Sequence, residues 1–237
     1  CLKKEPMKNG DVVPILKNTQ GHPEAPRLWS KHIHNILTTK MNLKATKHEP
    51  CLYKGVYRGH KIFLIRQVDD FSISAPTTSI ANAFYHDLDD YLIEPLKMQD
   101  VINYFSGVNL IQMRNCITVN CRMYLDRVLE RHGWTNISPN SNKGIVPLTS
   151  DSKIMRELEE TTGPTNPIDK RKMEKEMGFS YRTAIGKLIY AMVTCRPDIS
   201  FAVTKLSQYA NQPAQCHFTT VKNVFRYLAA TKDEGLT

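Results

Sequence analysis

The chain has 237 residues, 41% hydrophobic and 23% charged, which is enough for one large domain or one and a half small ones with a buried core. Its formal net charge of +9 favours a polyanionic partner, nucleic acid first and an anionic membrane surface second, although a merely basic soluble protein fits that charge equally well. No apolar run reaches the length of a membrane span, so we expect no membrane partner. The six cysteines form no C-x-x-C pair and no zinc-ligand spacing, which favours reduced thiols in an intracellular protein.

A loop that leads into an amphipathic helix is the first predicted element. Residues 1–20 are polar and irregular, and Gly21 follows them. Pro26 is tolerated in the first turn of a helix, and Arg27 beside it could meet a phosphate or pair with an acid. The helix is expected to place four apolar residues on one face: Trp29, Ile33, Ile36 and Leu37.

Two consecutive hairpins come next. Strand-forming residues predict strands over Leu52–Tyr57, Ile62–Val68 and Phe71–Ala75. Asp69 and Asp70 stand between the last two strands, and we expect them at the tip of a buried hairpin because Asp is a turn residue with apolar flanks here. Two adjacent carboxylates repel each other unless a cation lies between them. Hard divalent ions take such oxygen ligands, and a pair of ions serves in-line phosphoryl transfer, whereas a plain surface turn is the alternative.

A capped helix follows the hairpins. Its start is predicted at Thr77–Ser79. Its buried face is expected to hold four apolar residues: Ile80, Phe84, Leu88 and Leu92. Asp87, Asp89 and Asp90 on this helix compete as a metal site, but their positions favour a solvated face.

The middle of the chain predicts two strands and a short helix. Asn103–Leu110 is predicted as one strand that contains Gly107, and Ile117–Val119 as its partner. A glycine in a strand lets another backbone approach closely, and an ordinary bulged hairpin is the alternative. Met123–Gly133 is predicted as a helix that ends at its glycine.

The remainder divides into a connector and a helical region. Prolines punctuate the polar residues 136–179, which predicts a long, partly disordered connector. The last part is predicted as three helices, broken at Arg196–Asp198 and at Pro213, whose apolar faces could pack as a small bundle. The expected domains are therefore 1–135, 136–179 and 180–237.

Several of these motifs, in this order, resemble the copia-type reverse transcriptase of LTR retrotransposons (Pseudoviridae-like). The resemblance runs from about Val13 to Leu236. Gln67-Val68-Asp69-Asp70 resembles the Tyr-x-Asp-Asp box of reverse transcriptases, with Gln in place of Tyr. The helices after residue 180 resemble the connecting segment that follows the polymerase, and packing is the favoured interpretation of their apolar faces.

Two further segments carry the resemblance. Residues 21–29 resemble the loop and helix that position the template base and the incoming nucleotide, which implies that role for Gly21, Pro26 and Arg27. The family usually has Gln where this chain has Glu24. A second group of three residues resembles the primer grip of the family: Tyr104, Phe105 and Gly107.

The resemblance implies both a fold and a reaction. The fold would be α+β, with a palm-like antiparallel sheet and packed helices, followed by a helical thumb or connection region. The reaction would be RNA-directed DNA synthesis with two Mg²⁺ (or Mn²⁺) ions, for which Asp69 is the main ligand and Asp70 the secondary one. The implied partners are an RNA/DNA primer–template, dNTPs and the rest of a Pol polyprotein, with integrase and fingers upstream and ribonuclease H downstream. The implied location is intracellular, in a cytoplasmic virus-like particle and/or the nucleus.

One expected carboxylate has no match. The family's third metal ligand lies on a strand upstream of Gly21, usually followed by Val-Lys-Thr-Ala-Phe, and Asp11–Pro14 matches it poorly because Pro14 would break that strand. We therefore expect an internal piece of a polyprotein, or a decayed copy, that is inactive alone. The alternatives are a non-catalytic nucleic-acid-binding remnant and a plain basic scaffold protein.

Overall fold

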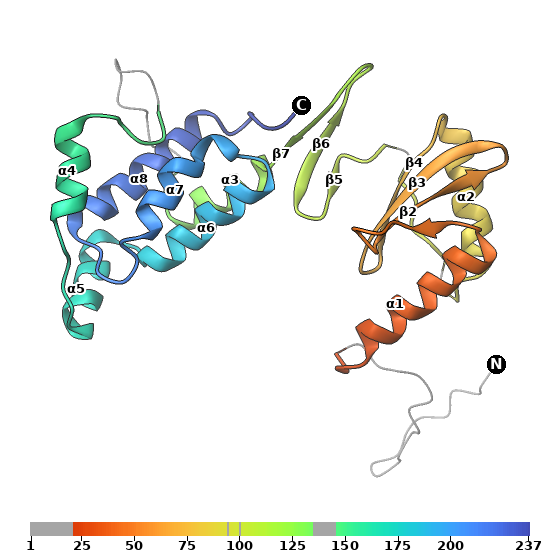
Figure 1. Ribbon diagram of the computed structural model, residues 1–237, viewed down its shortest axis with the longest axis horizontal. Coiled ribbons are helices and arrows are strands. Elements are labelled where there is room, and N and C mark those ends of the chain that lie inside the picture. The colour runs from red at the N-terminus through yellow and green to blue at the C-terminus, as the bar shows by residue number, and fades with distance from the viewer. Residues whose placement is uncertain (1–20, 94, 100, 135–145) are drawn as a thin grey trace, which may run out of the picture. The chain divides into compact units, whose positions relative to one another are not determined.

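The computed structural model describes residues 21–134 and 146–237, apart from 94 and 100, in two compact units (Figure 1). The units comprise residues 1–100 and 101–237, whereas the sequence predicted boundaries near 135 and 179. Each unit combines an antiparallel sheet with helices, which confirms the α+β class. No described helix combines the length and the apolar character that crossing a membrane requires.

The first unit is built on a four-stranded antiparallel sheet in the order β1-β2-β3-β4. The strands are β1 (Lys44–Ala45), β2 (Leu52–Tyr57), β3 (His60–Gln67) and β4 (Asp70–Ser74). Both predicted hairpins are present, and their strand ends differ from the prediction by no more than two residues. The sheet thus places the Asp-Asp pair at the junction of β3 and β4.

Two helices cover one face of this sheet. They are α1 (Ala25–Asn35), which continues as a π-helical turn (Ile36–Lys40), and α2 (Thr78–Asp89). The side chain of Thr77 caps α2 by accepting a hydrogen bond from the Ile80 amide, as predicted. Burial alternates along β3, so one set of its side chains packs under the helices and the other lies on an open face. The core between helices and sheet contains these residues: Ile33, Leu37, Tyr53, Ile62, Leu64, Phe84 and Leu88.

The aspartates of α2 are not the fully solvated face that the sequence predicted. Asp87 is partly buried and accepts hydrogen bonds from the Tyr57 hydroxyl and, at 3.1 Å, from Arg58. Asp89 is also partly buried and accepts a 2.7 Å bond from the Leu96 amide. The Asp87 contacts tie α2 to the turn between β2 and β3, and the Asp89 contact ties its end to the segment that follows it.

The second unit begins with a three-stranded antiparallel sheet: β5 (Tyr104–Phe105), β6 (Val108–Gln112) and β7 (Ile117–Asn120). The prediction of one strand over Asn103–Leu110 is wrong. The chain reverses at Ser106 and Gly107, whose φ angles of +50° and +92° match a type I′ hairpin turn.

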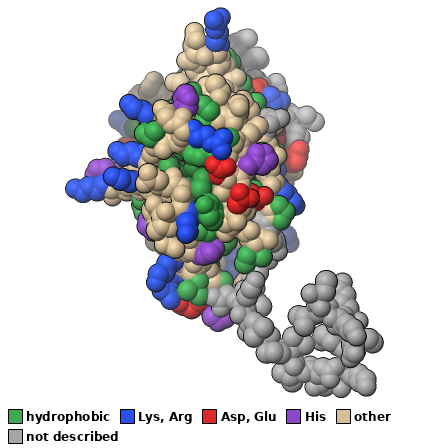
Figure 2. All heavy atoms as spheres, turned by 90° about the vertical axis from the view of Figure 1, so that its right-hand side faces the viewer, with side chains coloured by type: hydrophobic (Ala, Val, Ile, Leu, Met, Phe, Trp, Pro, Cys, Tyr) green, Lys and Arg blue, Asp and Glu red, His purple; other side chains and the backbone are tan. Residues whose placement is uncertain are grey.

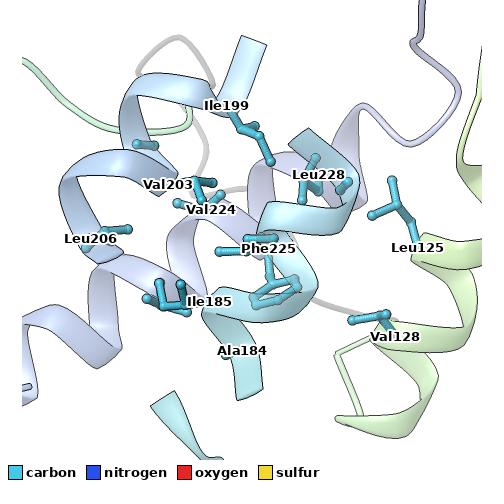
Figure 3. Close-up of a cluster of buried hydrophobic side chains, with 14 of the residues drawn as sticks. Leu125, Val128, Ala184, Ile185, Ile199, Val203, Leu206, Val224, Phe225 and Leu228 are labelled. Carbon is cyan, nitrogen blue, oxygen red and sulfur yellow. The ribbon is translucent and has the colours of Figure 1, made fainter. Parts of the chain in front are cut away.

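Four described helices pack their apolar faces together in the second unit. They are α3 (Arg122–Arg131), α6 (Tyr181–Thr194), α7 (Ser200–Ser207) and α8 (Gln215–Ala230), and a 3₁₀ turn (Pro197–Ile199) joins α6 to α7. The predicted apolar faces meet in one core, shown in Figure 3. Its members include Leu125, Val128, Ala184, Ile185, Ile199, Val203, Leu206, Val224, Phe225 and Leu228.

Two helices form in the segment that the sequence predicted as a polar connector. They are α4 (Ser152–Glu160) and α5 (Pro167–Met177). Side chains cap both starts, since Asp151 accepts a hydrogen bond from an amide of α4 and Asn166 accepts one from an amide of α5. Leu158 is the one fully buried side chain of α4, whose other residues are at least partly exposed. The expectation for residues 1–20 and 135–145 lies outside the described residues.

Candidate active site

The two adjacent carboxylates lie at the tight turn between β3 and β4. Gln67 pairs with Asp70, so Val68 and Asp69 form a two-residue turn. Only Asp69 therefore lies at the tip, and Asp70 opens β4, which shifts the predicted tip by one residue. Both carboxylates are exposed.

Val68 adopts a left-handed backbone conformation in this turn. Its φ is +57°, and a left-handed residue in the first turn position is the pattern of a type II′ turn, which favours glycine there. A β-branched residue in this region is a genuine outlier that costs about 1–3 kcal/mol. The turn that carries Asp69 is therefore strained, and surrounding contacts have to hold it.

Hydrogen bonds from two side chains hold the strained turn. The carbonyl oxygen of Val68 accepts a 2.9 Å bond from Trp29 Nε1 and a 3.2 Å bond from an Arg66 guanidinium nitrogen. Trp29 belongs to α1, and Arg66 also donates at 2.8 Å to Ser30 of the same helix. Side-chain hydrogen bonds therefore connect helix α1 to the acidic turn.

The start of α1 carries the residues predicted to position template and nucleotide. Gly21 has a φ of +94°, and Pro26 lies in the first turn of the helix, as predicted. Arg27 donates to Glu24 at 2.8 and 2.5 Å, which matches the acid-pairing alternative in the described structure. Both side chains are exposed, so the pair is worth only about 0–1 kcal/mol and Arg27 can exchange this partner for another anion.

The open face of the sheet carries lysines and apolar side chains next to the acidic turn. Directly opposed residues share a face of an antiparallel pair. One row joins Lys44, Lys54 and Phe63, and a row nearer the turn joins Ile65 with Ser72. Exposed lysines thus alternate with exposed apolar side chains on this face. Basic side chains also project beside hydrophobic ones on the face of the molecule that Figure 2 shows.

The donor set suits a hard divalent cation in part. Asp69 and Asp70 offer carboxylate oxygens, the ligands that Mg²⁺ prefers. Within residues 21–134 and 146–237, however, no three His, Cys, Asp or Glu side chains gather as a metal-binding group. A cation held here would take its remaining ligands from water, substrate or residues outside the described part of the chain.

The primer-grip-like residues lie in the second unit. Tyr104 and Phe105 form β5, and Gly107 occupies the turn that follows. A Cβ atom at Gly107 would collide with the hydroxyl of Tyr190 on α6. The glycine therefore serves a left-handed turn and a close side-chain contact, rather than the backbone approach within a strand that the sequence suggested.

Sequence reasoning missed the two residues that hold the turn. Arg66 follows Ile62 and Leu64 in the alternation along its strand, so its position is predicted to be buried. A charged residue at a buried position was the available signal. Trp29 was predicted on the inner face of α1, but its hydrogen bond to Val68 depends on the tertiary structure.

Comparison with known proteins places these features in a family. The profile described as "Reverse transcriptase (RNA-dependent DNA polymerase)" matches residues 4–147. The Retrovirus-related Pol polyprotein from transposon TNT 1-94 of Nicotiana tabacum is 29% identical over 95% of this chain, which is 16% of that protein. The corresponding polyprotein from transposon RE1 of Arabidopsis thaliana is 27% identical over 95% of the chain and 14% of its own length.

A shorter relative covers a larger share of its own length. A putative transposon Ty5-1 protein of Saccharomyces cerevisiae is 27% identical over 90% of this chain and 63% of its own length. The chain thus spans about a sixth of the tobacco polyprotein and less of the Arabidopsis one. No solved structure matches the chain.

Proposed function

Because the chain belongs to the reverse transcriptase (RNA-dependent DNA polymerase) family, we propose that it supplies the acidic turn of a retrotransposon polymerase and synthesises DNA when its active site is complete. The family match and the transposon relatives confirm the resemblance found in the sequence. The observation that supports a catalytic role is the exposed Asp69–Asp70 pair at a strained turn, which two side chains hold in place.

The chain's own residues have separable tasks in this proposal. Asp69 and Asp70 hold a divalent cation, Mg²⁺ or Mn²⁺, of the kind that the family generally uses. When bound, two such ions in the complete enzyme would supply the chemistry that lowers the pKa of the primer 3′-hydroxyl and stabilises the leaving pyrophosphate. Arg27 is placed to exchange Glu24 for a nucleotide phosphate. Exposed Lys44 and Lys54 attract the nucleic-acid backbone and release its counterions.

The proposed partners follow from the family. They are an RNA or DNA primer–template, dNTPs and the remainder of a Pol polyprotein, including an integrase and fingers region upstream and a ribonuclease H downstream. We propose action in a cytoplasmic virus-like particle and/or the nucleus. Tyr104, Phe105 and Gly107 contribute the contact with the primer end in this proposal.

A non-catalytic nucleic-acid-binding remnant is the second candidate. The observation that favours it is the absence of a third metal-binding side chain beside the turn, within the described residues. Mg²⁺ demands near-octahedral geometry and dehydrates reluctantly, so two carboxylates alone bind it weakly. Both candidates predict nucleic-acid binding, and they differ in DNA synthesis.

Binding and extension assays separate the candidates. Fluorescence anisotropy with a labelled primer–template should show that the logarithm of affinity falls linearly with the logarithm of salt concentration. A flat salt dependence, or no binding at low salt, contradicts both candidates.

Primer extension with Mg²⁺ and dNTPs then tests catalysis. The 237-residue chain should extend very poorly, and a longer protein that restores the upstream strand with its Asp should extend well. Asp69→Asn should abolish extension in that longer protein. Asp90→Asn, which changes an exposed carboxylate of the same unit, should leave extension intact. Brisk synthesis by the 237-residue chain would show that two carboxylates suffice, and an inactive longer protein would favour the remnant.

A further inference from the structure

Arg66 is a buried cation without an acidic partner in the described structure. Its side chain is only 6% exposed, and it forms no ion pair with any described carboxylate. Its Nε is buried and has no hydrogen-bond partner among the described residues. Burial of an uncompensated charge is costly, so this position needs a reason other than stability.

The contacts of Arg66 point to the acidic turn. One guanidinium nitrogen donates to the Val68 carbonyl at 3.2 Å, and the other donates to Ser30 Oγ at 2.8 Å and lies 3.6 Å from Cys51 Sγ. Trp29 Nε1 donates to the same Val68 carbonyl at 2.9 Å. The carbonyl oxygen has two lone pairs, and two side-chain donors engage it.

These two donors act on the peptide bond that precedes the predicted metal ligand. The Val68 carbonyl and the Asp69 amide belong to one planar group, so fixing the carbonyl fixes the direction in which the chain enters Asp69. A left-handed Val68 would relax into a commoner conformation if nothing held it. Two hydrogen bonds from a buried arginine and a tryptophan provide the restraint that a strained turn requires.

A third polar contact joins α1 to the sheet, after those of Trp29 with Val68 and Ser30 with Arg66. His34 Nδ1 lies 3.0 Å from the hydroxyl of buried Tyr53 on β2. Burial raises the pKa of Tyr53, and the nearby positive charge of Arg66 opposes that rise. Polar contacts inside an otherwise apolar interface have strict geometry, so they specify the position of α1 on the sheet.

We propose that Trp29 and Arg66 are positioning residues that lock the Val68–Asp69 peptide, so that the Asp69 carboxylate is presented to its cation in one direction. The lock also couples the turn to α1, which carries Arg27 at its start. This inference rests on the proposed function, because it assigns to the two residues a role in the cation site of that function. If Arg66 only fills space, removal of its donors leaves the turn and its cation affinity unchanged.

The conformation of the turn tests the lock without any metal. We would assign the backbone NMR spectrum of the 237-residue chain and follow Val68, Asp69 and the indole protons of Trp29 and Trp134. Trp29→Phe keeps an aromatic ring and removes the indole N–H donor, and Arg66→Met keeps an unbranched side chain and removes the charge. Both should shift or broaden the Val68 and Asp69 signals, and Arg66→Lys should restore them in part. Lys61→Met, the same change on the open face of β3, should not affect them.

Cation affinity tests the consequence of the lock. Titration with Mn²⁺ should broaden the Asp69 and Asp70 amide signals, and Asp69→Asn should remove that effect. Loss of a group that orients a metal ligand typically weakens binding 10–100-fold, so Trp29→Phe and Arg66→Met should each raise the half-broadening concentration about tenfold.

Each outcome has one meaning. Turn signals that stay unchanged in both variants overturn the lock, and a displaced turn with unaltered Mn²⁺ affinity overturns the positioning role. If the unmodified chain shows no Mn²⁺ effect at the turn, the proposed metal site fails, and the metal-free spectra still decide whether the lock exists. If Arg66→Met fails to fold, Trp29→Phe decides, because Trp29 is only partly buried and Phe keeps an aromatic side chain there.

Discussion

Two buried arginines, one in each unit, differ in how completely their donors are satisfied. Arg196 is 1% exposed and binds Asp198 through two bonds, at 2.9 and 2.7 Å. It also donates to the carbonyl and hydroxyl of Thr231, and its guanidinium stacks 5.4 Å from the centre of the Tyr227 ring. Arg66 is almost as buried but has no described carboxylate partner and an unsatisfied Nε.

We interpret the difference as a structural use of buried charge at Arg196 and a functional use at Arg66. Burial alone would raise the pKa of Asp198, but hydrogen bonds from Arg196 and Tyr227 outweigh it and lower that pKa. This network joins the start of α7 to the end of α8, so it fixes the helical bundle. The donors of Arg66 contact the carbonyl of an exposed turn and the hydroxyl of Ser30, so we expect its burial to contribute less to the fold.

Replacement of the two arginines should give the largest difference in unfolding free energy. Arg196→Met leaves Asp198 and the Thr231 carbonyl without their partner and should cost about 3–5 kcal/mol of unfolding free energy. Arg66→Met removes an unpaired buried charge and should change unfolding free energy by less than about 1 kcal/mol. Urea unfolding of both variants measures this contrast, and equal losses would contradict the distinction.

Buried His217 should give a smaller, pH-dependent loss in the second unit. Its Nδ1 accepts a 2.8 Å bond from the Ala214 amide, and its Nε2 donates at 2.8 Å to the Leu158 carbonyl. Burial lowers the pKa of His217, although the Leu158 carbonyl and Glu157 oppose this. The unfolded chain therefore binds a proton first, so stability is complete above about pH 6.5 and falls as pH drops toward the lowered pKa.

A variant of His217 checks that pH dependence. Asn in place of His217 can still accept the Ala214 amide bond but loses the bond to Leu158, which should cost about 1–3 kcal/mol at neutral pH. It should also flatten the slope of stability between pH 7 and 5. His132→Asn is the necessary control, because burial, followed by nearby Lys187, lowers the pKa of His132 as well. An unchanged slope in His217→Asn would contradict the assignment.

The turn in the second unit should be less tolerant than the acidic turn. Gly107→Ala introduces a left-handed alanine and a collision with the Tyr190 hydroxyl, and it should cost about 1 kcal/mol or more. Tyr190→Phe in the same chain should recover part of that loss. Thermal unfolding of the single and double variants decides, and a neutral Gly107→Ala would mean that the turn relaxes freely.

The smallest effect is expected at the carboxylates themselves. Asp69→Asn and Asp70→Asn remove exposed charges that repel each other, so metal-free unfolding should change by no more than about 0.5 kcal/mol, in the stabilising direction if at all. If either residue were a structural cap, its loss would cost about 1 kcal/mol. Urea titration in chelator-containing buffer distinguishes the two.

The parts of the fold that were predictable have strong local signals. Alternating strand formers located β2 and β3, the Thr77 cap located α2, and apolar spacing located the helices of the bundle. The helices α4 and α5 were missed because neither has a wide apolar face: side chains cap both starts, α4 buries only Leu158, and α5 buries no residue fully. The β5–β6 turn was missed because two-residue strands are too short to show alternation.

Only the acidic residues of the candidate site were predictable from the sequence. The Asp-Asp pair and its apolar flanks identified the turn, since the motif is contiguous in sequence. Alternation along β3 marked Arg66 as a buried cation, but its partners were not predictable. The hydrogen bonds of Trp29 and Arg66 reach Val68 from residues 39 and two positions away, and they form only when α1 packs on the sheet. The support that α1 gives to the acidic turn depends on the tertiary structure, so the sequence alone does not show it.

Among the described residues β4 lies at the edge of its sheet, which gives the acidic pair a second consequence. An edge strand exposes backbone groups that can recruit a strand from another molecule, and charged residues discourage that growth. Asp69 and Asp70 stand where β4 begins, so we expect repulsion between the acidic pairs of two copies to discourage strand pairing at this end of β4. A bound divalent cation would neutralise the same charges and remove this repulsion. Metal binding should therefore lower the resistance of the chain to aggregation at this edge.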